Sequence, residues 1–278
     1  MLAGVDGSAQ ECPGEPMSFE IVCDTGDLTR AIDAFSQQYH EDYFRVRNAA
    51  KSYFALPLSP ASARGLAAPL LAALKSWGAG KRAAPACRPM DVAVQALQLP
   101  ALQNMLRDLA GSFPYLGVAD GRRVLKDGAA FATVTEFDHC LIGTLNALAD
   151  ALMVGNTNVT YPMKALLLVA GLAPAFDSQV KGGLAVAGVA GINKTRYLLP
   201  RGACGDARKI CVLPFHIAQC VAAARPLLDT AIRSSRYPML IGEYGRLFDV
   251  LLFQQRRRTR QTALVGFSGA GEHRWYDI

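Results

Sequence analysis

No uninterrupted apolar run in this 278-residue sequence is long enough to predict a membrane span. The longest apolar run, residues 165–176, is interrupted by Gly171 and Pro174 and is far shorter than the roughly 20 residues that cross a bilayer. The first 17 residues lack the basic and apolar regions of a signal peptide. We therefore expect a cytoplasmic protein with no membrane partner.

Closely spaced cysteines are also missing. The seven cysteines include no Cys-x-x-Cys pair, so the sequence predicts neither a disulfide framework nor an iron–sulfur cluster. The one group with zinc-ligand residue types is Cys204, Cys211, His216 and Cys220. His216 and Cys220 are four residues apart and would share a helix face, but Cys204 and Cys211 are spaced too widely for a zinc knuckle. We expect buried thiols and no metal cofactor, with a zinc enzyme as a less favoured alternative.

Motifs for common enzyme chemistries are absent as well. The sequence contains neither a Walker A motif nor a dinucleotide-binding glycine fingerprint after a strand. None of its four histidines lies beside a Gly-x-Ser-x-Gly elbow. Whether the protein is an enzyme therefore stays open at this level.

Basic charge, by contrast, is concentrated near the C-terminus. Residues 194–278 hold 14 basic and 6 acidic residues, whereas residues 1–50 hold 3 basic and 9 acidic ones. Clustered cations attract the phosphates of nucleic acid, although arginines at a helix end also serve simply to solvate it. The candidates for phosphate contact are Lys194, Arg196, Arg256, Arg257, Arg258 and Arg260. DNA or RNA is therefore a predicted partner.

Apolar residues recur at helical spacing along most of the chain, which predicts a mainly α fold. Asp27 is expected to cap the first helix and Ser59 the second, and Pro100 is expected to divide a later helical pattern in two. The only strand signal lies in residues 115–134, where Asp120-Gly121 predicts a small hairpin or meander. With 51% apolar residues, the helices can form a single globular domain or two packed lobes.

Composition divides the chain into five parts. Residues 1–17 are rich in Gly, Pro, Glu and Ser, as is typical of a flexible leader, and residues 78–89 have the composition of a linker. The predicted parts are the leader (1–17), an N-terminal helical lobe (18–77), the linker (78–89), a main helical domain with the β insertion (90–255) and a basic, loose C-terminal tail (256–278).

The stretch from Val154 to Leu184 is the centre of the pattern, with a glycine-bounded loop, an apolar helix and a second turn. The helix that Pro162 opens is expected to be buried nearly all round and to end at Gly171. Asp177 stands where the next helix needs an N-cap, and Asp138 is expected to cap an earlier helix. Three charged residues are expected on the wetter side of the last helix: Glu243, Arg246 and Asp249.

Gly155, expected to end the helix before this stretch, is followed 22 residues later by Asp177 in the segment Ala-Phe-Asp-Ser-Gln-Val. Over about 30 residues the chain resembles the helix-hairpin-helix DNA glycosylases. The resemblance implies that Asp177 assists cleavage of the glycosidic bond of a flipped base and that Gly155 belongs to a phosphate-binding hairpin. Asn156-Thr157 departs from that hairpin motif. Val159 stands where bifunctional members carry a lysine, which excludes lyase chemistry by that lysine.

Two kinds of function fit these patterns. The first is a nucleic-acid-associated protein whose basic C-terminal third contacts phosphates, with Asp177 as the catalytic candidate and a glycosylase-like enzyme as a less favoured form. The second is a non-enzymatic helical protein that binds a protein partner or self-associates. A steep fall of affinity with salt distinguishes them, because neutralised phosphates release counterions.

Overall fold

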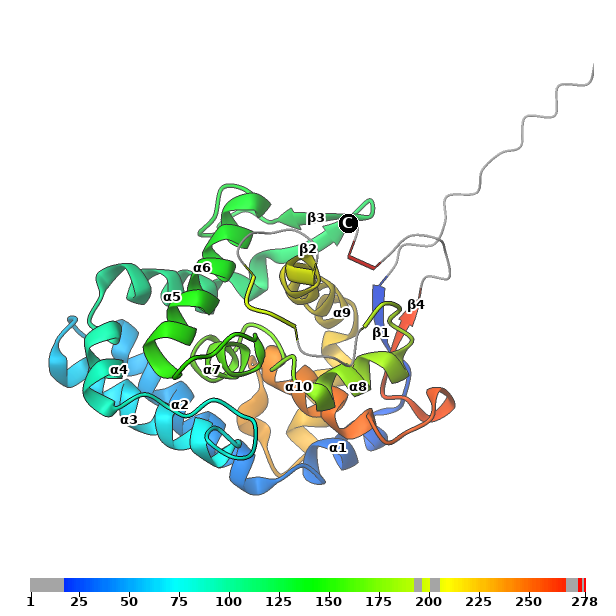
Figure 1. Cartoon of the computed structure of the whole chain (residues 1–278). Helices are drawn as coiled ribbons and strands as arrows, with labels where there is room; N and C mark the ends of the chain where they lie inside the picture. Colours follow the sequence, from blue (N-terminus) through cyan, green and yellow to red (C-terminus); the bar gives the residue numbers. More distant parts are fainter. Residues whose placement is uncertain (1–17, 193–196, 201–205, 269–274, 277) are drawn as a thin grey trace, which may run out of the picture.

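The computed structural model describes residues 18–192, 197–200, 206–268, 275–276 and 278 (Figure 1). Of the residues that the structure describes, 64% are helical, which confirms the predicted mainly α fold. The helices of the described residues are α1 (Thr25–Asp33), α2 (Gln37–Ala55), α3 (Pro60–Ser76), α4 (Met90–Leu97), α5 (Pro100–Ser112), α6 (Val134–Leu152), α7 (Thr160–Ala170), α8 (Ser178–Ala187), α9 (Asp206–Ser234) and α10 (Tyr244–Gln255). The strands are β1 (Ser18–Ile21), β2 (Leu116–Ala119), β3 (Arg122–Leu125) and β4 (Val265–Ser268).

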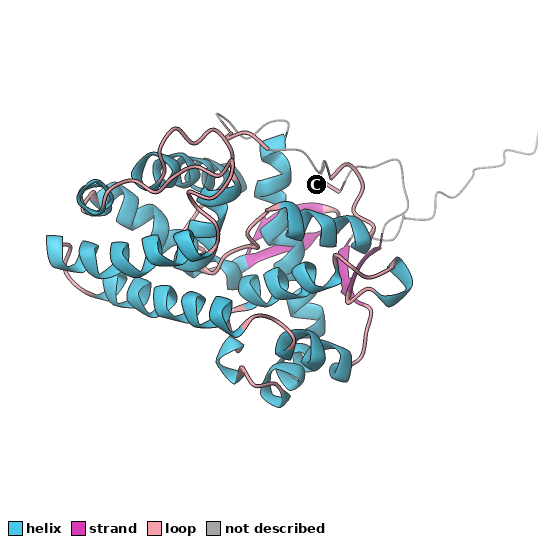
Figure 2. Ribbon diagram, turned by 60° about the horizontal axis from the view of Figure 1, so that its bottom comes forward, coloured by secondary structure: helices cyan, strands magenta, loops and turns pink. Residues whose placement is uncertain are grey.

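The strands form two small antiparallel sheets, which Figure 2 shows beside the much larger helical part. β2 and β3 make the hairpin expected within residues 115–134, with Leu116 opposite Leu125. Its turn, Asp120-Gly121, has positive φ at both residues (49° and 65°), which is the geometry of a tight turn that matches the twist of the strands. No third strand follows the hairpin among the described residues before α6.

The second sheet joins two distant parts of the chain. β1 pairs with β4, and Phe19 lies directly opposite Phe267. The two rings meet edge to face with their centroids 5.1 Å apart, so cross-strand packing stabilises this short pair. β4 falls within residues 256–278, which the sequence predicts to be a loose tail. This strand was not predicted, because four residues show too little alternation of apolar and polar side chains.

Side-chain caps and prolines set where several helices begin. Asp24, and not Asp27, caps α1, because its carboxylate accepts a hydrogen bond from the Asp27 N–H at 2.8 Å. Thr133 caps α6 by accepting from the N–H three residues later at 3.1 Å. Ser59 caps α3 as predicted, and Pro100 opens α5 after the break from α4. Each of the three capping residues has the extended backbone that this role requires.

The long helix α9 lies near the middle of the molecule and is seen almost end-on in Figure 1. Residues 207–234 are long and apolar enough to cross a membrane by length and composition, but 61% of the most apolar window is buried inside the fold. The helix begins at Asp206 and continues through Pro214. Residues 211–218 are all buried, and this packing outweighs the hydrogen bond that a proline removes. α9 thus has the burial of a core helix.

Close packing of α7, α8 and α10 builds the region of interest. As predicted, α7 is buried nearly all round and ends at Gly171, which has the left-handed conformation with φ of 66°. α8 lies against α10 at a separation that only glycine permits, since a Cβ on Gly183 would be 2.0 Å from the carbonyl oxygen of Leu252. This approach places Asp177, at the start of α8, in one cleft with the C-terminal end of α10.

Candidate functional site

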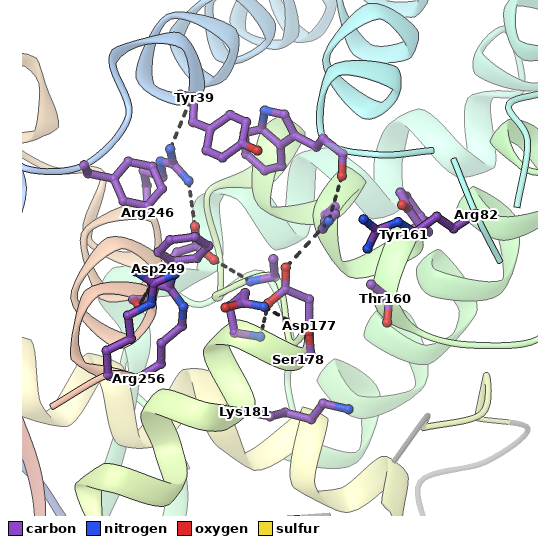
Figure 3. A pocket seen from close by; sticks show the side chains of 17 residues that line it. Tyr39, Arg82, Thr160, Tyr161, Asp177, Ser178, Lys181, Arg246, Asp249 and Arg256 are labelled. Carbon is purple, nitrogen blue, oxygen red and sulfur yellow. Dashed lines mark hydrogen bonds and ion pairs between the residues drawn. The ribbon is translucent and has the colours of Figure 1, made fainter. Parts of the chain in front are cut away.

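A cleft of about 710 Å³ opens where the starts of α7 and α8 meet α10 (Figure 3). The junction of α1 and α2 and the segment after α3 complete its wall. The lining residues are Phe35, Tyr39, Trp77, Arg82, Thr160, Tyr161, Lys164, Ala175, Asp177, Ser178, Gln179, Lys181, Arg246, Asp249, Phe253, Arg256 and Arg257.

The lining of the cleft combines cations with aromatic rings. Six of the residues are Lys or Arg, two are acidic and five are aromatic. Excess positive charge in a concave site attracts anions, and aromatic faces stack on planar groups. The cleft therefore suits a ligand that carries both a negative group and flat rings.

Asp177 serves as the N-cap of α8, as its sequence position predicts. Its Oδ1 accepts hydrogen bonds from the N–H groups of Gln179 at 2.9 Å and Val180 at 3.1 Å. Its Oδ2 lies 3.6 Å from the Nζ of Lys164. Because the cap uses only Oδ1, the second oxygen remains at the cleft wall, and the side chain keeps 17% of its surface exposed.

The backbone just before Asp177 is strained. Phe176 has φ of 45°, which is rare for a bulky side chain, and it is fully buried against Tyr197 with ring centroids 5.0 Å apart. Arg82, also at the cleft, has φ of 54°. Such residues cost roughly 1–3 kcal/mol each and cluster at functional sites. One of these two residues, Arg82, lines the cleft, and the other, Phe176, directly precedes Asp177.

Lys164 is a cleft residue that sequence reasoning missed. It donates a hydrogen bond to the Trp77 carbonyl at 3.0 Å and lies 5.0 Å from the centre of the Tyr161 ring. Together with the contact to Asp177, these interactions connect the end of α3, α7 and the start of α8 through one ammonium group. The available signal was that Lys164 is the one charged residue in an otherwise apolar helix.

The arginine run divides between the cleft and the outside. Arg256 and Arg257 line the cleft, and Arg256 lies over the ring of Phe253 at 3.9 Å. Burial and the neighbouring charge of Arg257 lower the pKa of Arg256. Arg258 instead donates to the Thr262 carbonyl at 3.2 Å, and Arg260 does not line the cleft. Two of the four arginines therefore share a site with Asp177.

The remaining predicted nucleic-acid contacts do not join this group. Gly155 has the left-handed conformation but does not line the cleft. It also does not end α6, because that helix stops at Leu152 with Met153 as its C-cap. Lys194 and Arg196 lie outside the described residues.

The charged residues of α10 are not on a wetter side, as the sequence predicted, but are buried. Arg246 is 1% exposed and donates to Asp249 at 2.6 Å and to the Tyr39 carbonyl at 3.0 Å. Glu243 accepts from Arg47 at 2.9 Å, and also from Tyr43 and Lys51. Each charge is compensated by a partner, which is the condition under which a charge can be buried.

Asp138 is likewise not a cap. It accepts two hydrogen bonds from the Arg123 guanidinium, at 2.6 and 2.9 Å, which ties α6 to the β2–β3 hairpin. A two-bond pair of this kind is stronger and more directional than a single neutral hydrogen bond.

Of the residues considered for zinc, Cys211, His216 and Cys220 are buried. No group of three potential ligands occurs among the described residues, and Cys204 lies outside them. Burial raises the pKa of the Cys220 thiol to about 12. Burial also lowers the pKa of His216 to about 4, although its Nε2 lies 2.8 Å from the carbonyl oxygen of Trp275.

No protein-family model matches the chain, and no curated protein and no solved structure matches it with a significant score.

Proposed function

We propose that the protein binds nucleic acid through the basic, aromatic cleft. The observation that carries this proposal is that Arg256 and Arg257 line the same cleft as Asp177 and the aromatic wall. Arginines bind phosphate oxygens through charged hydrogen bonds, and aromatic rings stack on bases of any sequence. A strand of DNA or RNA supplies both groups in one ligand.

The crowding of the two arginines supports an anionic ligand. The charge of Arg257 makes the charged form of Arg256 less favourable, while Asp177 opposes this effect. A phosphate between the two guanidinium groups would remove their mutual repulsion. Asp177 is the catalytic candidate, because its Oδ2 is not used by the helix cap.

The test is binding of purified protein to labelled single- and double-stranded DNA and RNA across a salt series. Replacing both Arg256 and Arg257 by Ala should weaken binding about tenfold. The slope of log affinity against log salt should fall by about 0.7 per lost contact on single strands or about 0.9 on duplex. The matched control replaces Arg258 and Arg260, which belong to the same run but do not line the cleft.

Three outcomes are informative. Equal losses in both double variants would mean that the run acts as a general basic surface, and the cleft would not be the site. Absence of binding at low salt would overturn the proposal and favour a protein partner or self-association. If binding holds, a base-excision assay with Asp177→Asn tests whether the site also performs the chemistry that the glycosylase resemblance implies.

A further inference from the structure

A second cavity, of about 340 Å³, lies between the ends of α5 and α7, the middle of α9 and the start of α10. We call it the α9 cavity. Its lining residues are Arg47, Ala110, Gly111, Phe113, Pro114, Lys126, Ala170, Gly171, Ala218, Val221, Ala222, Arg225, Gly242, Glu243 and Tyr244. None of these lines the cleft described above. Its volume is within the range of small-molecule sites, about 300–1,000 Å³.

Small side chains leave this space open. Seven of the fifteen lining residues are alanine or glycine. Gly171 cannot be enlarged, because it has φ of 66° and a Cβ there would lie 2.9 Å from Glu243 Oε2. The cavity is therefore built into the packing of α7 against α10.

Aromatic and apolar groups form one wall of the α9 cavity. The rings of Phe113 and Tyr244 are nearly parallel, at an interplanar angle of 26° with centroids 6.3 Å apart. Ala218 and Val221, from α9, are buried beside them in the lining. A flat apolar group fits such a wall.

The acidic group of the α9 cavity is already neutralised. Burial alone would raise the pKa of Glu243, but the charge of Arg47 and the donors around it lower that pKa below its usual value. Arg47 and Lys51 lie 2.9 and 3.0 Å from its two carboxylate oxygens, and the Tyr43 hydroxyl donates to it at 2.7 Å. Glu243 is thus an anion with its own set of partners.

Two further cations border the α9 cavity without a carboxylate partner among the described residues. Arg225 donates from Nε to the Tyr244 hydroxyl at 3.2 Å and lies 5.4 Å from the centre of that ring. Lys126 is exposed and its ammonium makes no hydrogen bond or ion pair with a described residue. Asp229, beyond the Tyr244 hydroxyl, accepts from that hydroxyl and pairs with Arg233. The net charge of the side chains around the α9 cavity is therefore positive.

We propose that the α9 cavity binds a small aromatic carboxylate, with its ring against Tyr244 and Ala218 and its carboxylate at Arg225 and Lys126. The ring would bury apolar surface in space that alanine and glycine leave free. The carboxylate would give the two border cations the anion that no described residue supplies. A neutral ligand of the same shape would leave that charge balance unchanged.

The probe is benzoate, with benzamide as its neutral counterpart, and the readouts are calorimetric affinity and amide NMR shifts on the full chain. Benzoate should shift the amides of residues around Ala218 and Tyr244 and bind about tenfold more tightly than benzamide, as expected for one charge-assisted contact. Replacing both Arg225 and Lys126 by Ala should remove most of that preference. Arg233→Ala, an exposed cation on the same helix, should leave benzoate affinity within about twofold.

Filling the cavity gives a second, independent test. Ala222 is exposed on α9 and lines the cavity, so Ala222→Leu should preserve the fold while weakening benzoate about tenfold. Equal affinity for benzoate and benzamide, or shifts centred on the cleft residues, would overturn the proposal. So would an Ala222→Leu variant that folds normally and binds benzoate unchanged. These results do not depend on nucleic-acid binding, because the two sites share no lining residue.

Discussion

The two ends of α10 carry charged side chains in opposite ways. From the N-cap to the middle of α10, Glu243, Arg246 and Asp249 are buried, and each has a partner of opposite charge within 3.0 Å. Arg246 and Asp249 line the cleft, but they are paired with each other. At the C-terminal end Arg256 and Arg257 lie side by side at the cleft, and among the described residues the charge of Asp177 opposes the effect of Arg257 on Arg256. Compensated charges have little capacity left for a ligand, whereas crowded like charges gain from binding an anion. The same helix thus contributes to stability at one end and to recognition at the other.

The largest effect on stability is expected from a substitution at Asp249. Asp249→Ala removes the partner of Arg246, whose guanidinium is 1% exposed and packed near the rings of Phe35, Tyr43 and Trp77. An uncompensated buried charge costs about 3–5 kcal/mol, so the free energy of unfolding in urea should fall by about that amount.

A double variant separates the loss of a partner from the loss of packing. Replacing Arg246 by Met together with Asp249 by Leu removes both charges and keeps apolar volume. It should be more stable than Asp249→Ala alone, because the penalty for an unpaired charge is gone. A double variant that is less stable than Asp249→Ala would instead show that Arg246 stabilises the fold through its remaining contacts, the Tyr39 carbonyl and the aromatic rings.

His216 represents a third arrangement, an ionisable group buried without charge. Its pKa falls from the ordinary 6.5 to about 4, mainly because burial disfavours the cation. The unfolded chain takes up a proton below pH 6.5 while the folded chain does not. The contribution of His216 to the free energy of unfolding is therefore complete above pH 6.5. As the pH falls towards 4, that free energy decreases by about 3 kcal/mol.

The measurement is the free energy of unfolding between pH 7 and 4 for the native chain and for His216→Phe. The variant loses the hydrogen bond to the Trp275 carbonyl, so its stability is lower at neutral pH. Its decline over this pH interval should nevertheless be smaller by about 3 kcal/mol. If the free energy of unfolding fell equally with pH in the two proteins, protonation of His216 would not be the cause of the decline.

Local sequence rules predicted those parts of the fold that depend on a few neighbouring residues. Ser59 as a cap, Gly171 as a helix end and the Asp120-Gly121 turn all follow from backbone preferences within one turn. The β1–β4 sheet and the burial of Glu243 did not follow, because they depend on distant residues. Arg47, for example, lies 196 positions from Glu243 in the chain.

For the candidate site, the sequence predicted single residues but not how the fold brings them together. Asp177 and the pair Arg256 and Arg257 stood out by position and charge, but nothing local indicated that α8 and α10 would bring them together. That approach depends on Gly183, which packs against the backbone of Leu252. The aromatic wall was not predicted either, since Tyr39 and Trp77 come from separate elements.

A smaller effect is expected at Asp177, which has a charged partner in Lys164 and also lines the cleft. Asp177→Ala removes the acceptor for two N–H groups and should lower the free energy of unfolding by about 1 kcal/mol. Asp177→Asn keeps an acceptor oxygen and should change it by only a few tenths of a kcal/mol. Urea titrations of the two variants make the comparison, and equal losses would mean that the charge, not the cap, stabilises α8.

The smallest effect is expected at Arg257. This residue is exposed, and its charge disfavours the charged form of Arg256. Arg257→Ala should therefore leave the free energy of unfolding unchanged within about 0.5 kcal/mol, or raise it slightly, as for most surface substitutions. Added salt should reduce any gain, because it screens the repulsion that the substitution removes. A loss above about 1 kcal/mol would place Arg257 among the residues that hold the fold together, and the contrast between the two ends of α10 would no longer stand.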